Sequence, residues 1–450
     1  MAKRRSVYRR VPAEGGAAVA PATRREFLST CGVLAVAANA HAMERQAARL
    51  AEWPSSFPAL RQEVNGQPLA YLDSGATTLR PQSVIDALVD YYSTDNANPA
   101  KVHRLAARAA DRLTLARLTL ARFIHAPDPS EIIFVRGTTE GINLVASAWG
   151  GANLKKGDEI IISIAEHYSN LLPWRRAAAN AGAMVRVADV DDEGRLTPDR
   201  LTAVLSKRTR LVAFSHVSNV LGYVNPVREL TAAAKHVGAT VVVDGAQGAP
   251  HVAIDVQDLG CDFYILSGHK MLGPMGTGVV WGHRALLDAM PPYHVGSNMA
   301  HDVTATGAEL EHGALKFQAG TPDVAGPVGL SAAVSFFEQA GRDAVQRHDE
   351  MLATHGLLRL REVPGLRIIG PTSASNRVPV FTFTLPGHTA AAIAAHLDQQ
   401  GIAVRAGDMA ALPLLRRFGV TEAVRASAYL YTTAADIDRL AAALRQVLRV

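Results

Sequence analysis

The chain has 450 residues, 48% hydrophobic and 19% charged, which is typical of a globular protein and predicts one large domain plus a smaller one. Residues 1–42 hold seven of the 46 basic and two of the 41 acidic residues, so the net charge of +5 belongs to this leader and gives no sign of nucleic-acid binding. Two cysteines, Cys31 and Cys261, exclude a disulfide framework and a cysteine zinc site, and no run is apolar enough to predict a membrane span.

The leader has two interpretations. Residues 23–28 match a twin-arginine export signal, and a mildly apolar stretch with small residues suited to cleavage follows. Alternatively, Met43 is the true start, and residues 1–42 are an Arg/Ala-rich extension of a cytoplasmic enzyme. Because Ser29, Thr30 and Gly32 interrupt the apolar stretch, we favour the second interpretation. Residues 43–70 would then be an N-terminal arm.

The first part of the body is mostly helical by pattern. Apolar spacing predicts helices over 44–62, 81–92 and 106–124, with Pro54 and Pro58 interrupting the first. Residues 71–78 predict a short strand that runs into a turn of small residues. The polar segment 96–104 predicts a loop.

From residue 131 onward, β-branched runs alternate with helical patterns. The predicted strands are 131–135, 159–164, 184–190, 211–215, 240–244 and 263–266. The predicted helices between them are 138–149, 169–181, 197–205 and 227–237. This alternation predicts an α/β fold with a mostly parallel sheet between layers of helices.

Polar residues follow these strands with regularity. In such sheets, ligands bind beyond the carboxyl ends of the strands. The clusters there are Arg136–Thr139, Glu166–His167, His216–Asn219, Asp244–Gln247 and Ser267–Lys270. Five in succession predict a functional site rather than soluble loops.

Lys270 is the centre of this predicted site. It stands just after a buried strand and before the Gly/Pro-rich loop 273–278. A lysine whose pKa is lowered by burial can form an imine with an aldehyde, although most lysines in loops are simply solvated. An aldehyde cofactor with a pyridine ring also needs an acid at the ring nitrogen, and Asp244, which ends an apolar strand, is placed to supply it.

The remaining clusters can serve the same cofactor. Thr138 and Thr139 open a helix, where they could hold a phosphate or merely cap the helix. His167 could stack on a ring or act as an acid or base, and Gln247 could donate to a ring oxygen. Taken singly, each residue is more often structural.

The pattern changes after residue 323. A helix over 325–341 leads to predicted strands at 377–385, 402–404 and 426–431 and to helices at 388–400 and 436–448. We therefore expect a large cofactor-binding domain over 71–325 and a small α+β domain over 326–450.

Several long motifs carry a resemblance to a known family. From about residue 55 onward, the chain resembles the pyridoxal-phosphate enzymes of the class V aminotransferase family, and within it the group II cysteine desulfurases and selenocysteine lyases. The motifs that carry this resemblance are EVNGQPLAYLDSGATT, EIIFVRGTTEGINLVA, HVSNVLG, VVVDGAQGAPH, CDFYILSGHKMLGPMGTG, FQAGTP, GIAVRAG and VRAS.

The resemblance implies a fold-type-I homodimer that binds pyridoxal 5′-phosphate (PLP). Lys270 would form the Schiff base and His167 would stack on the ring, while Asp244 and Gln247 would contact its nitrogen and hydroxyl. The phosphate would be held by Thr139, Ser267, His269 and, reaching over from the partner subunit, Thr321. The substrate would be bound by Asn219, Arg405, Arg425, His103 and Arg104.

One part of the chain departs from the family's pattern. Desulfurases carry a cysteine in a loop of the form RxGHHCAxP, whereas this chain has Ala410 at that position and Asp408 and Met409 in place of the two histidines. The only cysteine of the body, Cys261, is expected to be a small core residue. The segment NANPAKVHRLA and Tyr168, which replaces the second histidine of an EHH-type motif, also differ.

Three functions follow as alternatives. The first is removal of sulfur or selenium from an L-amino acid to give alanine, with a thiol or a sulfur-acceptor protein in place of the missing cysteine, or with a better leaving group such as selenocysteine or a sulfinate. The second is other PLP chemistry on the same fold, as in an epimerase, a C–S lyase or an aminotransferase. The third is an inactive PLP-binding regulator, which is disfavoured because such a protein has no need for Lys270, Asp244 and Arg405 together.

Overall fold

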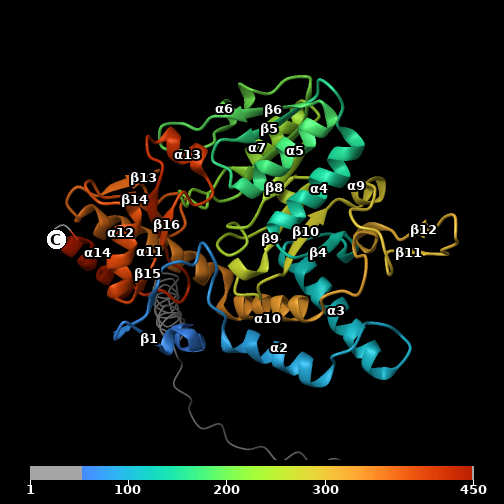
Figure 1. Ribbon diagram of the computed structural model, residues 1–450, viewed down its shortest axis with the longest axis horizontal. Helices are drawn as coiled ribbons and strands as arrows, with labels where there is room; N and C mark the ends of the chain where they lie inside the picture. Colours follow the sequence, from blue (N-terminus) through green and yellow to red (C-terminus); the bar gives the residue numbers. More distant parts are fainter. Residues whose placement is uncertain (1–52, 448–450) are drawn as a thin grey trace, which may run out of the picture. The chain divides into compact units, whose positions relative to one another are not determined.

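The computed structural model describes residues 53–447, and its centre is a seven-stranded sheet (Figure 1). The predicted leader and the first part of the predicted arm lie outside the described residues. The sheet has the order β4-β10-β9-β8-β7-β5-β6. In chain order its strands are β4 (Ile132–Val135), β5 (Glu159–Ser163), β6 (Met184–Ala188), β7 (Thr209–Ser215), β8 (Thr240–Asp244), β9 (Phe263–Ser267) and β10 (Gly278–Gly282).

Parallel pairing dominates this sheet. The neighbours from β6 to β9 are parallel, and only β10 runs antiparallel to both β9 and β4. Every residue of β5, β8 except Thr240, β9 and β10 is buried, as expected for strands covered on both faces. The predicted mostly parallel α/β sheet is confirmed.

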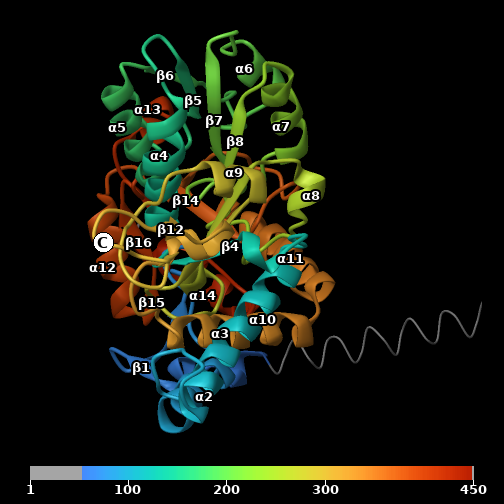
Figure 2. The same ribbon diagram turned by 90° about the vertical axis from the view of Figure 1, so that its right-hand side faces the viewer.

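Helices cover both faces of the sheet (Figure 2). On one face lie α4 (Thr138–Asn153) and α5 (Leu172–Ala181). On the other lie α6 (Pro198–Thr202), α7 (Val227–His236) and α8 (Val256–Leu259). The clusters that follow β4, β5, β7, β8 and β9 meet at one edge of the sheet, because these five strands run in the same direction.

The N-terminal elements differ from the sequence prediction. Where the helix 44–62 was expected, the described part has two 3-10 turns, Trp53–Ser56 and Pro58–Arg61, because the prolines break the α-helical pattern. Short strands follow at β1 (Glu63–Val64), β2 (Gln67–Pro68) and β3 (Ala70–Tyr71). The helices α2 (Gln82–Thr94) and α3 (Arg104–Phe123) pack on α10 (Ala325–Ala340).

A connecting region lies between β10 and α10. It contains α9 (Arg284–Ala289), the two-stranded hairpin of β11 (Ala300–His301) and β12 (Glu309–Leu310), and a 3-10 turn over Gly313–Phe317.

A second, four-stranded antiparallel sheet forms in the C-terminal part, in the order β13-β14-β17-β16. Its strands are β13 (Arg367–Ile369), β14 (Val380–Thr384), β16 (Arg405–Gly407) and β17 (Ala423–Ser427), while β15 (Ile402–Ala403) pairs with β3 instead. The helices of this part are α11 (Arg342–Arg361), α12 (Ala390–Gln399), α13 (Leu412–Arg417) and α14 (Ala434–Val447). Gly356 allows α11 to lie close to β14, because a Cβ there would stand 2.2 Å from the Phe381 ring.

The strand predicted over 426–431 was placed too late. The structure has the strand at 423–427, and residues 428–431 leave the sheet although they are buried. There, Tyr429 packs edge-on against His251 and Phe337. Apolar character alone does not distinguish such a buried loop from a strand.

Within residues 53–447, no helix is long and apolar enough to cross a membrane. Over the same residues, no group of three or more His, Cys, Asp or Glu side chains could hold a metal ion.

Candidate active site

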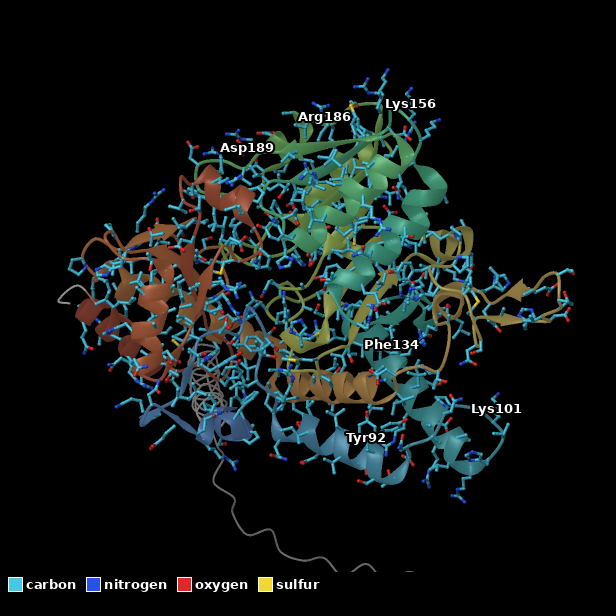
Figure 3. All side chains as sticks on the ribbon, in the orientation of Figure 1. Tyr92, Lys101, Phe134, Lys156, Arg186 and Asp189 are labelled. Carbon is cyan, nitrogen blue, oxygen red and sulfur yellow. The ribbon has the colours of Figure 1, made fainter. Side chains whose placement is uncertain are left out.

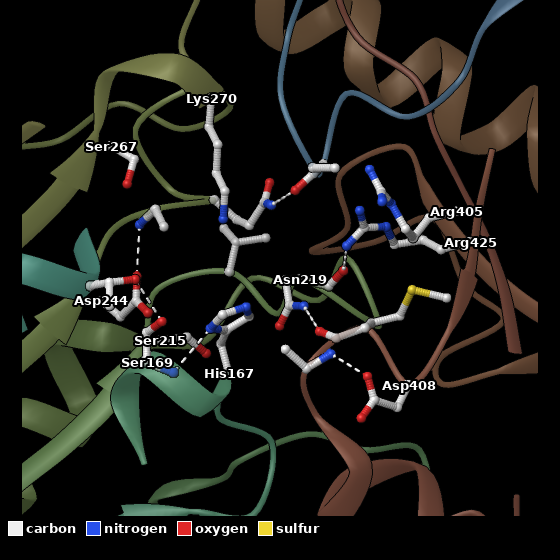
Figure 4. Close-up of a pocket in the computed structure, with 18 of the residues that line it drawn as sticks. His167, Ser169, Ser215, Asn219, Asp244, Ser267, Lys270, Arg405, Asp408 and Arg425 are labelled. Carbon is white, nitrogen blue, oxygen red and sulfur yellow. Dashed lines mark hydrogen bonds between the residues drawn. The ribbon is translucent and has the colours of Figure 1, made fainter. Parts of the chain in front are cut away.

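A cavity of about 480 Å³ lies where the two sheets approach each other (Figure 4). One wall comes from the strand ends of the large sheet and carries Lys270, Asp244 and His167. The other comes from residues 405–410 and Arg425 of the C-terminal sheet. The site is therefore built from segments far apart in sequence.

Lys270 and Asp244 both line this cavity. The Lys270 amine has no hydrogen-bond partner among the described residues, and burial lowers its pKa to about 8. Asp244 is 5% exposed, and its carboxylate accepts one hydrogen bond within the described chain, from Ala246 N at 2.9 Å. Burial raises the pKa of Asp244, and a cation in the cavity would offset that cost.

The loop after β8 is held close to the sheet beneath it. A Cβ at Gly245 would stand 2.1 Å from the Tyr264 ring, so glycine is needed for this approach. His216 does not line the cavity; its Nδ1 lies 2.9 Å from the Tyr264 hydroxyl beneath the loop. Gln247 does line the cavity, and its amide donates to Gly75 O at 2.7 Å.

Hydroxyl groups gather at the start of α4. The Ser267 hydroxyl accepts from Thr138 N at 2.8 Å and lies 2.8 Å from the Thr138 hydroxyl. Thr139 and Ser169 both line the cavity, and their hydroxyls lie 2.7 Å apart. His269 also lines this end. A helix N-terminus with several hydroxyls is suited to an anion such as phosphate.

His167 lines the cavity as a neutral imidazole. Burial lowers its pKa to about 4, and Lys270 and Arg425 add to the effect. Its Nδ1 accepts a hydrogen bond from Ser169 N at 3.1 Å, so the proton of the neutral ring is on Nε2. The preceding Glu166 is buried and accepts from Ser163 and Asn170, both at 2.7 Å, which fixes the turn that carries His167.

Two arginines on the opposite wall share one carboxylate. Arg405 contacts Asp73 at 2.6 Å, and Arg425 lies 3.5 Å from the other Asp73 oxygen. Arg425 is buried, donates to Asn219 O at 3.0 Å and has an Nε without a partner among the described residues. A backbone hydrogen bond from Ser427 N to Leu72 O, at 2.7 Å, holds the segment that carries Asp73 next to the two arginines.

The loop that carries Ala410 is tied down by hydrogen bonds. Asn219 Nδ2 donates to Met409 O at 2.9 Å, and Tyr168 N donates to Ala410 O at 2.8 Å. Met409 and Ala410 have φ of 52° and 54°, a left-handed conformation that costs non-glycine residues about 1 kcal/mol each. Ala410 lines the cavity, and the one cysteine among the described residues, Cys261, is fully buried elsewhere.

Most of the predicted site residues line this cavity together. They are Thr139, His167, Asn219, Asp244, Gln247, Ser267, His269, Lys270, Arg405 and Arg425. Thr138 lies behind Ser267 and is buried.

Three predicted residues lie away from the cavity in this single chain: His103, Arg104 and Thr321. His103 caps α3 by accepting from Ala106 N at 3.2 Å, and Figure 3 shows the nearby Lys101 at the loop between α2 and α3. Thr321 is exposed in the segment before α10.

Among the polar residues in or beside the cavity, Ser169, Ser215 and Asp73 were not singled out from the sequence. Ser215 ends β7, so the strand-end rule could have found it one residue before His216. Its buried hydroxyl has no partner among the described residues. Ser169 and Asp73 had no signal beyond their place beside His167 and in the turn after β3.

Comparison with known proteins agrees with this geometry. The family described as aminotransferase class-V matches residues 70–440. The chain belongs to the class V aminotransferase family. Its members use PLP, so the enzyme class and the cofactor predicted from the sequence are confirmed.

Curated relatives extend the similarity to cysteine desulfurases. The chain is 46% identical to the cysteine desulfurase of Dickeya dadantii, over 88% of this chain and 96% of that protein. It is 44% identical to the cysteine desulfurase of Synechococcus elongatus over 87% of this chain, but that match spans only 62% of the longer relative. A crystal structure of a cysteine desulfurase from Escherichia coli superposes with a TM-score of 0.82 at 37% identity, covering 89% of this chain and 98% of that chain.

The cavity fits PLP by its own chemistry. It pairs an amine of lowered pKa with a buried carboxylate of raised pKa, and it has hydroxyls at a helix start. The unpaired Ser215 hydroxyl and Arg425 Nε also need polar partners. These are the groups that an aldehyde, a pyridine nitrogen, a phosphate and an amino-acid carboxylate would satisfy.

Proposed function

We propose that this enzyme removes sulfur from L-cysteine to give L-alanine and that an external thiol accepts the sulfur. The observation that carries the proposal is the shared cavity of Lys270, Asp244 and the Arg405–Arg425 pair, in a chain 42–46% identical to several cysteine desulfurases. Ala410, at the cavity wall, has no atom that could accept sulfur.

The reaction balances without an added oxidant. The Cβ–S bond of cysteine breaks and a Cβ–H bond forms, while an S–S bond forms between the released sulfur and the external thiol. One cysteine and one thiol thus give one alanine and one persulfide. The thiol is supplied by a small molecule or by a sulfur-acceptor protein.

The cavity residues would have different roles in this reaction. When bound, PLP supplies an electron-accepting ring that weakens the bonds at the substrate's α-carbon. Lys270 would hold the aldehyde and then move a proton, Asp244 would hold the ring nitrogen protonated, and the neutral His167 would lie on the ring. Arg405 and Arg425 would bind the substrate carboxylate, which then competes with Asp73 for the two guanidinium groups.

Thr139, Ser267 and His269 would hold the phosphate, with Thr321 approaching from the partner subunit of a homodimer, and His103 and Arg104 would lie near the substrate entrance. The location of these last three outside the cavity of a single chain is compatible with that arrangement. We also propose that residues 71–325 form the large cofactor-binding domain and residues 326–450 the small domain. We propose that the enzyme is cytoplasmic.

The test is alanine release by PLP-loaded protein. L-cysteine plus a reducing thiol is supplied in one reaction and L-selenocysteine in another. Alanine from cysteine at a catalytic rate supports the proposal. Alanine from selenocysteine alone would make the enzyme a lyase that depends on its leaving group. No alanine from either would contradict the proposal.

Ala410 also favours a second candidate. An enzyme that breaks a C–S bond, epimerises or transaminates needs no thiol at position 410. Pyruvate, the D-amino acid or a keto acid among the products would identify this second function.

A further inference from the structure

Asp408 places a negative charge in the wall of the cavity. It lies in the loop after β16, next to Met409 and Ala410, and Figure 4 shows it across the cavity from Lys270. One of its oxygens accepts from the Tyr168 hydroxyl at 2.6 Å and the other from Ala410 N at 2.9 Å.

Asp408 makes no ion pair within residues 53–447, whereas Asp73 is paired with two arginines. The hydrogen bond from Tyr168, followed by the one from Ala410 N, lowers the pKa of Asp408, so the carboxylate is ionised at neutral pH.

The position of Asp408 relative to the substrate follows from the other groups. In the proposed function, an amino acid would direct its amine toward Lys270 and its carboxylate toward Arg405 and Arg425. Its side chain would then face the part of the wall where Figure 4 shows His167 and Asp408, away from Lys270 and the arginines. His167 is neutral at pH 7, because its pKa is about 4, and Ala410 contributes a methyl group. Among the described residues, Asp408 is therefore the one charge on this part of the wall.

Building on the proposed function, we propose that Asp408 determines specificity by repelling amino acids whose side chains end in a carboxylate or a sulfinate. The site then accepts cysteine and other uncharged side chains and rejects aspartate and cysteine sulfinate. Like charges in a partly buried cavity repel by enough to give about a tenfold difference in affinity, reduced by salt.

Asp408 also shapes the loop, and this role must be separated from its charge. Its carboxylate accepts a hydrogen bond from Ala410 N, and its backbone carbonyl accepts one from Ala411 N at 2.9 Å. These two bonds hold the turn. Asparagine forms the same kind of turn with the same side-chain length. Asp408→Asn therefore removes the charge and keeps the loop.

The first measurement is calorimetric binding of L-asparagine and L-aspartate, which have nearly the same shape, to PLP-loaded protein. We expect the wild type to bind asparagine about tenfold more tightly or better. We expect Asp408→Asn to reduce that preference to within about twofold. Asp111→Asn, which removes an exposed charge on α3, should leave the preference unchanged.

Tyr168→Phe is the structural control. It removes the hydroxyl that bonds Asp408 but leaves the carboxylate in place. If charge is the cause, this variant keeps the preference for asparagine, although binding of both ligands can weaken. Loss of the preference in Tyr168→Phe to the same extent as in Asp408→Asn would overturn the inference in favour of a structural role.

Turnover separates this inference from the proposed function. Wild-type protein should release alanine from L-cysteine at least about tenfold faster, as kcat/KM, than from L-cysteine sulfinate, and Asp408→Asn should narrow that ratio. No alanine from cysteine would contradict the proposed function while the binding ratio still tests Asp408. Equal binding of the two ligands by the wild type, or no binding of either, would overturn the inference.

Discussion

The two walls of the cavity differ in how closely they keep to the family's pattern. The wall built on the large sheet keeps the lysine, the carboxylate and the histidine that PLP chemistry needs. The wall built on the C-terminal sheet keeps its two arginines but has Asp408, Met409 and Ala410 where desulfurases have two histidines and a cysteine. The difference teaches that activation of the substrate and acceptance of its sulfur are separate tasks, and that among residues 53–447 the cavity carries groups suited to the first but no thiol for the second.

The largest effect is expected at the first wall. Lys270→Ala should lower alanine formation from cysteine by roughly a thousandfold or more, because no other amine lies in the cavity among the described residues. The matched control is Lys156→Ala, an exposed lysine labelled in Figure 3, which should keep full activity. Substantial turnover by Lys270→Ala would contradict the assignment.

The Asp73 pairing at the second wall predicts a loss of stability. Asp73→Asn leaves the buried Arg425 without its ion pair, which should lower the free energy of unfolding by roughly 3 kcal/mol. The Asp192 carboxylate is 96% exposed and forms an ion pair with Arg417. Asp192→Asn removes this pair and should lower the free energy of unfolding by less than about 1 kcal/mol. Denaturant titration of both variants compares them, and equal losses would show that Asp73 has no special role.

The pH dependence of cofactor uptake tests the environment of Lys270. Burial lowers its pKa to about 8, so the amine is mostly protonated below pH 8 and mostly neutral above it. Since only the neutral amine attacks an aldehyde, the initial rate of PLP uptake by the apoprotein should rise about tenfold from pH 6 to pH 7 and level off above pH 8. A rate that continued to rise to pH 10 would indicate an ordinary solvated lysine.

A thiol placed on the second wall should have the smallest effect, limited to the first turnover and to one position. Ala410→Cys should give one alanine per site from cysteine without any added thiol, followed by faster turnover when thiol is present. Ala411→Cys is the neighbouring control, because residue 411 is fully buried and does not line the cavity. A burst of alanine in both variants would argue against a specific role for position 410.

Much of the large sheet and its site could be predicted because ligands bind beyond the carboxyl ends of parallel strands. Asp244 and Lys270 follow long apolar runs, and parallel strands bring such ends together. Residues 428–431 could not be told from a strand, because a buried loop is as apolar as a sheet. The Arg405–Asp73 contact and the Tyr168–Asp408 contact join residues 332 and 240 positions apart, which no local pattern encodes.

The central claim is that the sulfur acceptor comes from outside the chain. It is tested most directly by the rate of alanine formation from L-cysteine, with PLP-loaded wild-type protein, as the concentration of an added thiol is raised from zero. Because the substrate is itself a thiol, we predict slow alanine formation from cysteine alone with no initial burst of one alanine per site, and a rate that rises with added thiol until it saturates. Alanine at the same rate without thiol would contradict the claim.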